Sequence, residues 1–201
     1  MKVLDVIKGS DGRRGWRVLP DSSVIKGRNP FFLPEFEGGA EMSVALAVRI
    51  DRLGKGISPR FAYRYWTDLA PAFIIRAEKY AEILRSQGLP DSPAYAFDRA
   101  ILLGDFQSFD SEDVGKALMS LTAGEEIVTE GFIPAIAEEA SEVIPMLSRD
   151  NTLKTGDIVF LPFHEAAPRQ IRIGEKYSLN INLFNQKEQL LTTFKKFIRI
   201  L

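Results

Sequence analysis

The clearest pattern of apolar and polar positions lies in residues 43–50, where large and small side chains alternate. Val44, Leu46, Val48 and Ile50 alternate with Ser43, Ala45, Ala47 and Arg49. A period of two is typical of a β-strand with one face against a core. The other face carries small residues for most of its length. It therefore predicts either an element packed very closely there or a cavity above it.

The first half of the chain predicts short elements around this strand. Gly and Pro interrupt the apolar clusters of residues 1–40, which is typical of short strands and turns. After the central strand we expect a short helix over residues 59–66, a longer helix from Pro71 to Gly88, an extended segment over 95–103, and one or two helical turns from Ser111. The segment 72–75 fits a strand equally well.

The second half predicts one clear helix and further strands. Apolar residues at helical spacing predict a helix over 134–148, broken near Pro145 because proline lacks the N–H of the i→i−4 bond. A glycine-containing turn then leads into a strand at 158–163, and alternation over 171–183 predicts a hairpin that turns at Gly174. Strands outnumber helices without regular βαβ alternation. The expected fold class is therefore α+β, with β-rich mixed or antiparallel sheets and a few short helices.

Composition narrows the classes of function. The 201 residues include 26 Lys and Arg against 27 Asp and Glu, no Cys and one His, so the net charge is −1. No overall field favours nucleic acid or an acidic membrane, and thiolate, disulfide and zinc-ribbon chemistry is excluded. No apolar run reaches the length of a membrane span, and the first residues lack the apolar core of a signal peptide. We expect a cytoplasmic protein without nucleic-acid or membrane partners.

Two groups of side chains are candidates for chemistry. His164, the single imidazole, is followed by Glu165 and could act as a general base near neutral pH. A solvent-facing loop histidine is the competing interpretation. Glu35, Glu37 and Glu41 could hold Mg²⁺ through carboxylate oxygens, although such a group is more often a solvated turn.

Two other motifs favour structural interpretations. The glycine-containing segments DGRRG and GKG lack the spacing of a phosphate-binding loop. Lys195, Lys196 and Arg199 are interleaved with apolar residues, which indicates an amphipathic terminal strand or helix rather than a nucleic-acid patch.

Four segments in order resemble the fumarylacetoacetate hydrolase family. They are PFFLPEF with MSVALAVRIDRLGKGIS, FAYRYWTDLAPAFIIRAE, AYAFDRAILLGDF and IPMLSRDNTLKTGDIVFLP. The positions that match family motifs include Phe97, Asp98, Leu103 and Gly104, and then Thr152, Leu153, Gly156 and Asp157. The resemblance covers residues 30–185. It implies a fold like the family's C-terminal domain, within a single domain over residues 1–201 whose first 30 residues form an extension with strands.

The same resemblance implies that the family's chemistry is missing. The carboxylates that hold a divalent cation in the family fall at Ser43, Ala45 and Ile74, and two family lysines fall at Leu33 and Tyr95. The family's Gly-Thr-Pro falls at residues 162–164, including Phe163. Ser offers one neutral oxygen, and Ala and Ile offer none. We therefore expect no metal cofactor at this place, and Mg or Mn only at a relocated site.

Two functional hypotheses follow. The first is a catalytically degenerate homologue that acts in binding or assembly, as a homodimer, with a small apolar or keto-acid ligand in a pocket near Leu33, Tyr95 and Phe163. The second is a hydrolase or decarboxylase of acylpyruvate-type 2-keto acids with a relocated site at His164 and Glu165.

Overall fold

The described residues fold into two β-sheets and two α-helices. The computed structural model describes residues 1–9, 11–26 and 31–201. Within these residues a nine-stranded sheet runs in the order β2-β1-β10-β4-β5-β6-β3, with β11 beside β4 and β7 beside β5, and a four-stranded sheet runs β13-β12-β8-β9. This confirms the predicted β-rich α+β fold. The strands are β1 (Val3–Lys8), β2 (Arg14–Leu19), β3 (Val24–Lys26), β4 (Glu41–Ile50), β5 (Trp66–Arg76), β6 (Ile101–Leu103), β7 (Gln107–Ser108), β8 (Val114–Ala123), β9 (Glu126–Ile133), β10 (Ile158–Pro162), β11 (Arg169–Gln170), β12 (Lys176–Asn185) and β13 (Leu190–Arg199); the α-helices are α1 (Glu78–Ser86) and α2 (Ile136–Asp150), and 3₁₀ turns cover Asp21–Ser23, Pro59–Tyr65 and Ser92–Ala94.

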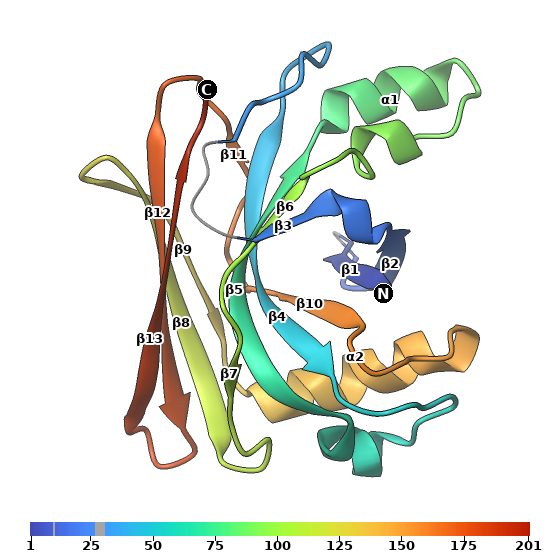
Figure 1. Cartoon of the computed structure of the whole chain (residues 1–201), viewed down its shortest axis with the longest axis vertical. Helices are drawn as coiled ribbons and strands as arrows, with labels where there is room; N and C mark the ends of the chain where they lie inside the picture. The colour runs from blue at the N-terminus through green and yellow to red at the C-terminus, as the bar shows by residue number, and fades with distance from the viewer. Residues whose placement is uncertain (10, 27–30) are drawn as a thin grey trace.

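The larger sheet is strongly curved. Its two end strands, β2 and β3, follow each other in sequence and are joined only by residues 20–23. Figure 1 shows the four-stranded sheet on the left and the curved sheet to its right, with α1 above and α2 below the first two strands. The N-terminal strands therefore belong to the same sheet as the central strand β4.

The two faces of β4 behave as its alternation predicts. Val44, Leu46, Val48 and Ile50 belong to the core between the two sheets, together with Leu121 of β8, Ile181 of β12 and Leu147 of α2. On the opposite face Ala45 pairs with Ala72, and Ala47 pairs with Ala70. These small residues share a second buried cluster with Phe160 and Tyr95. The short side chains thus leave room for two aromatic rings in the hollow of the sheet.

The first half of the helix predicted from Pro71 is wrong, and the alternative prediction of a strand over residues 72–75 is confirmed. Residues 66–76 form β5, and α1 begins only at Glu78. Pro71 is tolerated within the strand because it pairs with Leu46 on one side and falls between the partners on the other side, where β6 covers residues 72–74 and β7 covers 68–69. The missing N–H therefore removes no ladder hydrogen bond with either short strand.

The predicted break at Pro145 is also wrong, because α2 continues through it to Asp150. Loss of a helical hydrogen bond at an interior proline costs about 3 kcal/mol. Val143, Ile144 and Leu147 are completely buried on both sides of the proline, and each buried side chain of this size contributes about 1.5–3 kcal/mol. Burial of the apolar stripe thus outweighs the local cost.

The helical turn expected from Ser111 is present as one hydrogen-bonded turn, in which the N–H groups of Asp113 and Val114 bond to the Asp110 carbonyl oxygen, and β8 follows it directly. Two other expectations differ from the structure. Most of the extended segment expected over 95–103 is irregular, with only β6 as strand. The hairpin predicted at 171–183 is wrong as well. β12 pairs instead with β13 and β8. The alternation of apolar and polar residues shows which face of a strand is buried, but it does not show which strands pair with its edges.

The described helices are too short or too polar to cross a membrane.

Candidate functional site

The three positions to which the family resemblance assigns metal ligands converge on the concave face of the larger sheet. Ser43 of β4 lies directly opposite Ile74 of β5, and Ala45 lies two residues further along β4. Ile74 and Ala45 are both 2% exposed. The adjacency that the resemblance implies is therefore present in the fold, but the side chains offer one hydroxyl and no carboxylate.

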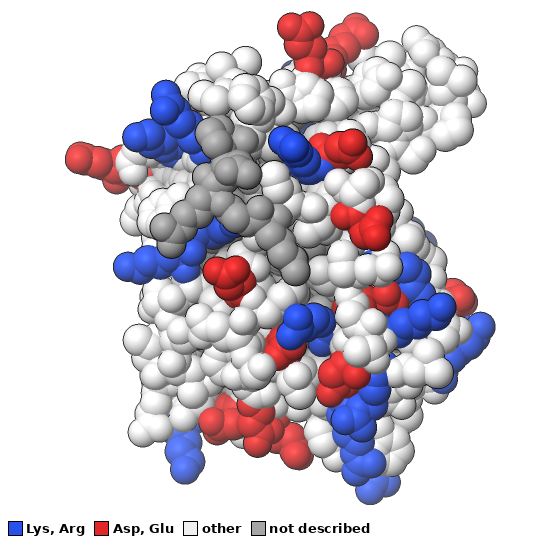
Figure 2. All heavy atoms as spheres, viewed as in Figure 1, with Lys and Arg blue, Asp and Glu red and all other residues white. Residues whose placement is uncertain are grey.

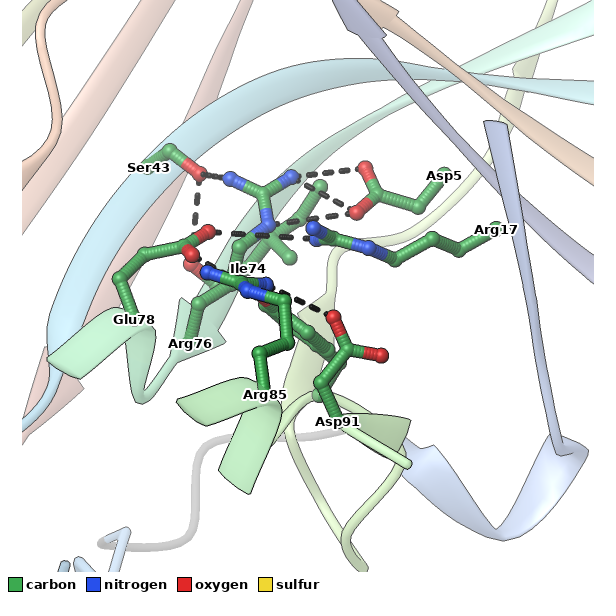
Figure 3. Close-up of polar contacts among 9 residues, drawn as sticks. Asp5, Arg17, Ser43, Ile74, Arg76, Glu78, Arg85 and Asp91 are labelled. Carbon is green, nitrogen blue, oxygen red and sulfur yellow. Dashed lines mark hydrogen bonds and ion pairs between the residues drawn. The ribbon is translucent and has the colours of Figure 1, made fainter. Parts of the chain in front are cut away.

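Arg76 supplies the main polar group at this place. Arg76 lies two residues after Ile74 on the same face of β5, and its Nη1 donates a hydrogen bond to Ser43 Oγ. Its Nη2 lies 2.7 and 2.8 Å from the two carboxylate oxygens of Asp5, and its Nε lies 3.2 Å from Asp5 Oδ2 (Figure 3). The side chains of Asp5 and Arg76 are only 1% and 15% exposed. This is a buried, multiply hydrogen-bonded ion pair.

The residues at this site do not fit a divalent cation. Mg²⁺ and Mn²⁺ require several oxygen ligands, and carboxylates normally supply the compensating charge. Here the single carboxylate, Asp5, is already paired with Arg76. In the described part of the chain, no group of three or more His, Asp or Glu side chains is placed to hold a metal ion.

A second polar layer lies behind the arginine and ties β2 to α1. Tyr95 donates a 2.7 Å hydrogen bond to Glu78 Oε2, and Arg17 of β2 lies over the Tyr95 ring at 3.4 Å. Arg17 Nη1 is 4.0 Å from Glu78 Oε1 (Figure 3). Burial and the hydrogen bond to Glu78 raise the pKa of Tyr95, against the opposing effect of Arg85 and Arg17. Tyr95 is therefore a neutral hydrogen-bond donor, and its contacts link β2 to α1.

A cavity of about 200 Å³ opens beside Arg76. It exists because β10 ends at Pro162 and β11 begins at Arg169, and both strands pair with β4. Residues 163–168 leave the sheet between them, so a gap separates the end of β1 from the start of β4. Ser43, Ala45 and Ile74 line this cavity together with Asp5, Arg76, Lys8 and Phe163.

The three residues expected around a ligand pocket lie in different places. Phe163 is 7% exposed and lines the cavity. Tyr95 is buried with its hydroxyl group on Glu78, in the layer behind Arg76. Leu33 packs against the core between the two sheets, and its N–H bonds to Leu201. The structure thus brings Phe163 to the cavity but not Leu33.

His164 and Glu165 do not lie together as a pair. The His164 ring stacks on Phe132 at 5.6 Å, and its Nε2 is 4.0 Å from Oε2 of Glu139 on α2. Glu139 Oε2 also accepts a 2.7 Å hydrogen bond from Arg14. Glu165 is exposed and has a left-handed backbone with φ of 62°. The carboxylate near the imidazole therefore belongs to Glu139, which is distant from His164 in the sequence, and not to Glu165.

The other charged motifs lie on the surface or in the sheet. Glu35 and Glu37 are exposed, and Glu41 accepts a hydrogen bond from Gln170. Lys195 points outward from β13 while Lys196 is 8% exposed, so the terminal run is an amphipathic strand. Figure 2 shows Lys and Arg gathered at the lower right with acidic side chains beside them, so charges of both signs mix on this face.

Sequence reasoning missed Asp5 and Arg76, which dominate the site. A signal was available, because each charge sits in or directly after an apolar strand segment, VLDVI and AFIIR. Charged residues in such a segment are rarely buried unless paired. Because Asp5 and Arg76 carry opposite charges, they were candidates to form an ion pair with each other.

Comparison with known proteins supports this fold. No family model and no curated protein matches the chain. Among solved structures, a fumarylpyruvate hydrolase from Pseudomonas aeruginosa in complex with Mn²⁺ and pyruvate matches with a TM-score of 0.79 and 18% identity, over 100% of this chain and 89% of that one. A protein from Yersinia pestis described as belonging to the fumarylacetoacetate hydrolase family matches with a TM-score of 0.78 and 24% identity, over 100% and 92%. A 2-hydroxyhepta-2,4-diene-1,7-dioate isomerase from Mycobacterium marinum matches with 0.78 and 16%, over 100% and 74%. The chain therefore has the fold of the fumarylacetoacetate hydrolase family.

Proposed function

We propose that this chain is a divergent member of the fumarylacetoacetate hydrolase family that works without a metal ion, as a binding or assembly protein. The fold supports the family, and the P. aeruginosa neighbour shows that the same fold can hold Mn²⁺ and pyruvate. The proposal concerns what replaced that chemistry here.

The observation that carries the proposal is the position of the Arg76 guanidinium. It bonds to Ser43, one of the three positions where the family resemblance places metal ligands, and Asp5 neutralises it. A cation entering here would meet a fixed positive group and no free carboxylate. Replacement of a metal site by a neutral internal ion pair preserves the fold while removing the Lewis acid.

Thermal unfolding with Mn²⁺ or Mg²⁺ tests this proposal. A ligand present at a hundred times its Kd stabilises the native state by about 2.7 kcal/mol, which is roughly 5–10 °C for a chain of this size. We expect no shift from millimolar metal after treatment with EDTA, with or without oxalate as a keto-acid mimic. A metal-dependent shift of that size would overturn the proposal.

A relocated active site is the second candidate, and the His164–Glu139 contact favours it. An imidazole 4.0 Å from a carboxylate could act as a general base, and the neighbouring Phe163 lines the cavity. Turnover of an acylpyruvate that is lost in His164→Ala and kept in Glu165→Ala would support this candidate. Unchanged turnover in His164→Ala would exclude it.

We also propose that the chain assembles as a homodimer. Ile127 and Phe197 lie in one cross-strand row on the outer face of the four-stranded sheet, with Leu118 on the same face, and all three are exposed. Light scattering coupled to gel filtration would give the mass, and Phe197→Ser should shift it toward the monomer if this face is involved. A monomeric wild-type chain would contradict the expectation.

A further inference from the structure

Another cavity opens between the two sheets, on the opposite face of the larger sheet from Arg76. Its volume is about 440 Å³, which lies within the range of about 300–1,000 Å³ that is typical of small-molecule sites. Its lining comes from the adjoining ends of β8 and β9, from β11 with the segment that follows it, and from Tyr177 of β12. The site around Arg76 makes no use of this space.

Arg169 of β11 reaches this cavity from one wall. It pairs with Met42 of β4, and residues directly opposite each other in a sheet share a face. Met42 belongs to the core between the two sheets, so Arg169 lies on the face toward the four-stranded sheet. Gln170, the next residue, lies on the other face, where it bonds to Glu41. The sheet itself therefore separates Arg169 from Ser43.

Glu126 of β9 reaches the same cavity from the facing wall. Ala123 of β8 pairs with both Glu126 and Tyr177, so these three residues share one face of the four-stranded sheet. Tyr177 is 3% exposed and belongs to the core between the two sheets. Glu126 therefore lies on the inner face of its sheet, at the open end of the space that Arg169 lines from the larger sheet.

The charges in the cavity wall cancel overall, but two of them have no partner. Arg172 and Glu175 form an ion pair at 3.5 Å, and Glu175 also accepts a 2.6 Å hydrogen bond from Tyr177. Arg169 and Glu126 are exposed, and neither forms an ion pair with the other or with any other described residue. One cavity thus presents a cation on one wall and an anion on the other. A ligand with both charges would pair with both walls, whereas a singly charged ligand would pair with only one.

Apolar groups complete the lining. Ala123 and Val128 contribute them from the four-stranded sheet, and Pro168 contributes them from the segment before β11. Val128 also packs against the core between the sheets. The space between the two charged walls therefore suits an apolar side chain.

From this arrangement we infer that the cavity binds a free α-amino acid with an apolar side chain. Arg169 holds the carboxylate, because the guanidinium group can donate two parallel hydrogen bonds to its oxygens. Glu126 holds the ammonium group, and the apolar lining contacts the side chain. This site lies on the opposite face of the sheet from the Asp5–Arg76 pair, so the inference is independent of the proposed metal-free function.

Calorimetric titration of the full chain with defined probes tests this inference. L-Leucine, L-valine and L-phenylalanine carry both charges, N-acetyl-L-leucine lacks the positive charge, and L-leucinamide lacks the negative charge. We expect at least one of the three amino acids to bind. For leucine, both derivatives should bind at least about fivefold more weakly, which corresponds to the loss of one partly exposed ion pair of about 1 kcal/mol.

Variants of the two walls identify the site. Arg169→Gln and Glu126→Gln should each weaken binding of the amino acid by about fivefold. Glu125→Gln is the matched control, because Glu125 is the neighbouring residue, is exposed and lies outside the cavity lining. It should leave the affinity unchanged.

Four results would overturn the inference. They are no binding by any of the three amino acids, equal binding of leucine and N-acetyl-leucine, unchanged affinity in Arg169→Gln or Glu126→Gln, and an equal loss in Glu125→Gln and Glu126→Gln. The last result would mean that the overall charge of this end of the molecule, and not the cavity, attracts the ligand.

Discussion

Arg76 holds the carboxylate of Asp5 through both Nη2 and Nε, although β10 and β4 lie between their two strands in the sheet. The curvature of the sheet brings the side chains across the gap on its concave face. Because Asp5 is 1% exposed, neither charge can be removed alone without leaving the other buried.

Asp5→Leu should therefore destabilise the chain by about 3–5 kcal/mol, the cost of an uncompensated buried charge. The double variant Asp5→Leu with Arg76→Met should recover most of this loss, since well-packed apolar residues often replace a buried pair at little cost. Urea unfolding measures both. A loss below about 1 kcal/mol in Asp5→Leu would show that solvent reaches Arg76.

Acid should destabilise the chain through Asp68. Burial acts to raise the pKa of Asp68, but hydrogen bonds from Ser108 and Arg49 outweigh it and hold the pKa below its ordinary value of 3.8. A depressed folded-state pKa gives stability that is present above the unfolded-state pKa and lost as pH falls through the folded-state value. The loss should therefore begin near pH 4 and continue below it.

Asp68→Asn should lower stability at neutral pH and flatten this part of the pH profile, measured by urea unfolding at a series of pH values. Asp105→Asn is the control, because Asp105 is exposed and its side chain makes no hydrogen bond or ion pair with a described residue. If Asp68→Asn follows the wild-type acid profile, other carboxylates cause the loss.

Gly104 is required by the close approach of β6 to Pro71. An added Cβ would lie 2.6 Å from Pro71 Cγ and 2.8 Å from its Cδ, and overpacking of this kind costs typically about 1–3 kcal/mol. Gly104→Ala should lower the urea midpoint accordingly. Gly15→Ala, where the new Cβ meets nothing within 4 Å, should change it little. Equal midpoints in the two variants would argue against the clash.

Tyr95→Phe removes the hydrogen bond that Glu78 accepts at 2.7 Å. Because the Glu78 side chain is 37% exposed and water can reach it, we expect a loss of about 0.5–1.5 kcal/mol, the net contribution of one hydrogen bond. The matched control is Tyr63→Phe, whose hydroxyl accepts from the exposed Arg64 and should contribute within about 0.5 kcal/mol. Thermal or urea unfolding distinguishes them, and a neutral Tyr95→Phe would mean that water replaces the hydroxyl.

Local pattern was sufficient where burial alone decides the structure. The alternation over 43–50 determined β4 and both of its faces, and the apolar stripe of residues 136–147 determined α2. The sequence pattern was insufficient where a neighbouring strand decides the structure. Pro71 is compatible with β5 only because its missing N–H falls between β6 and β7, and β12 pairs with β8 and β13 rather than with the segment just before it.

For the site, the sequence by itself determined that Ser43, Ala45 and Ile74, the positions to which the family resemblance assigns metal ligands, carry no carboxylate whatever the fold. Only the tertiary structure decided what stands there instead. Asp5 and Arg76 are 71 residues apart in the chain, and no local spacing predicts that they meet. Their contact depends on strand order and on the gap between β10 and β11. Those are set by the packing of the whole sheet, because long-range pairings become favourable only after many residues are already buried.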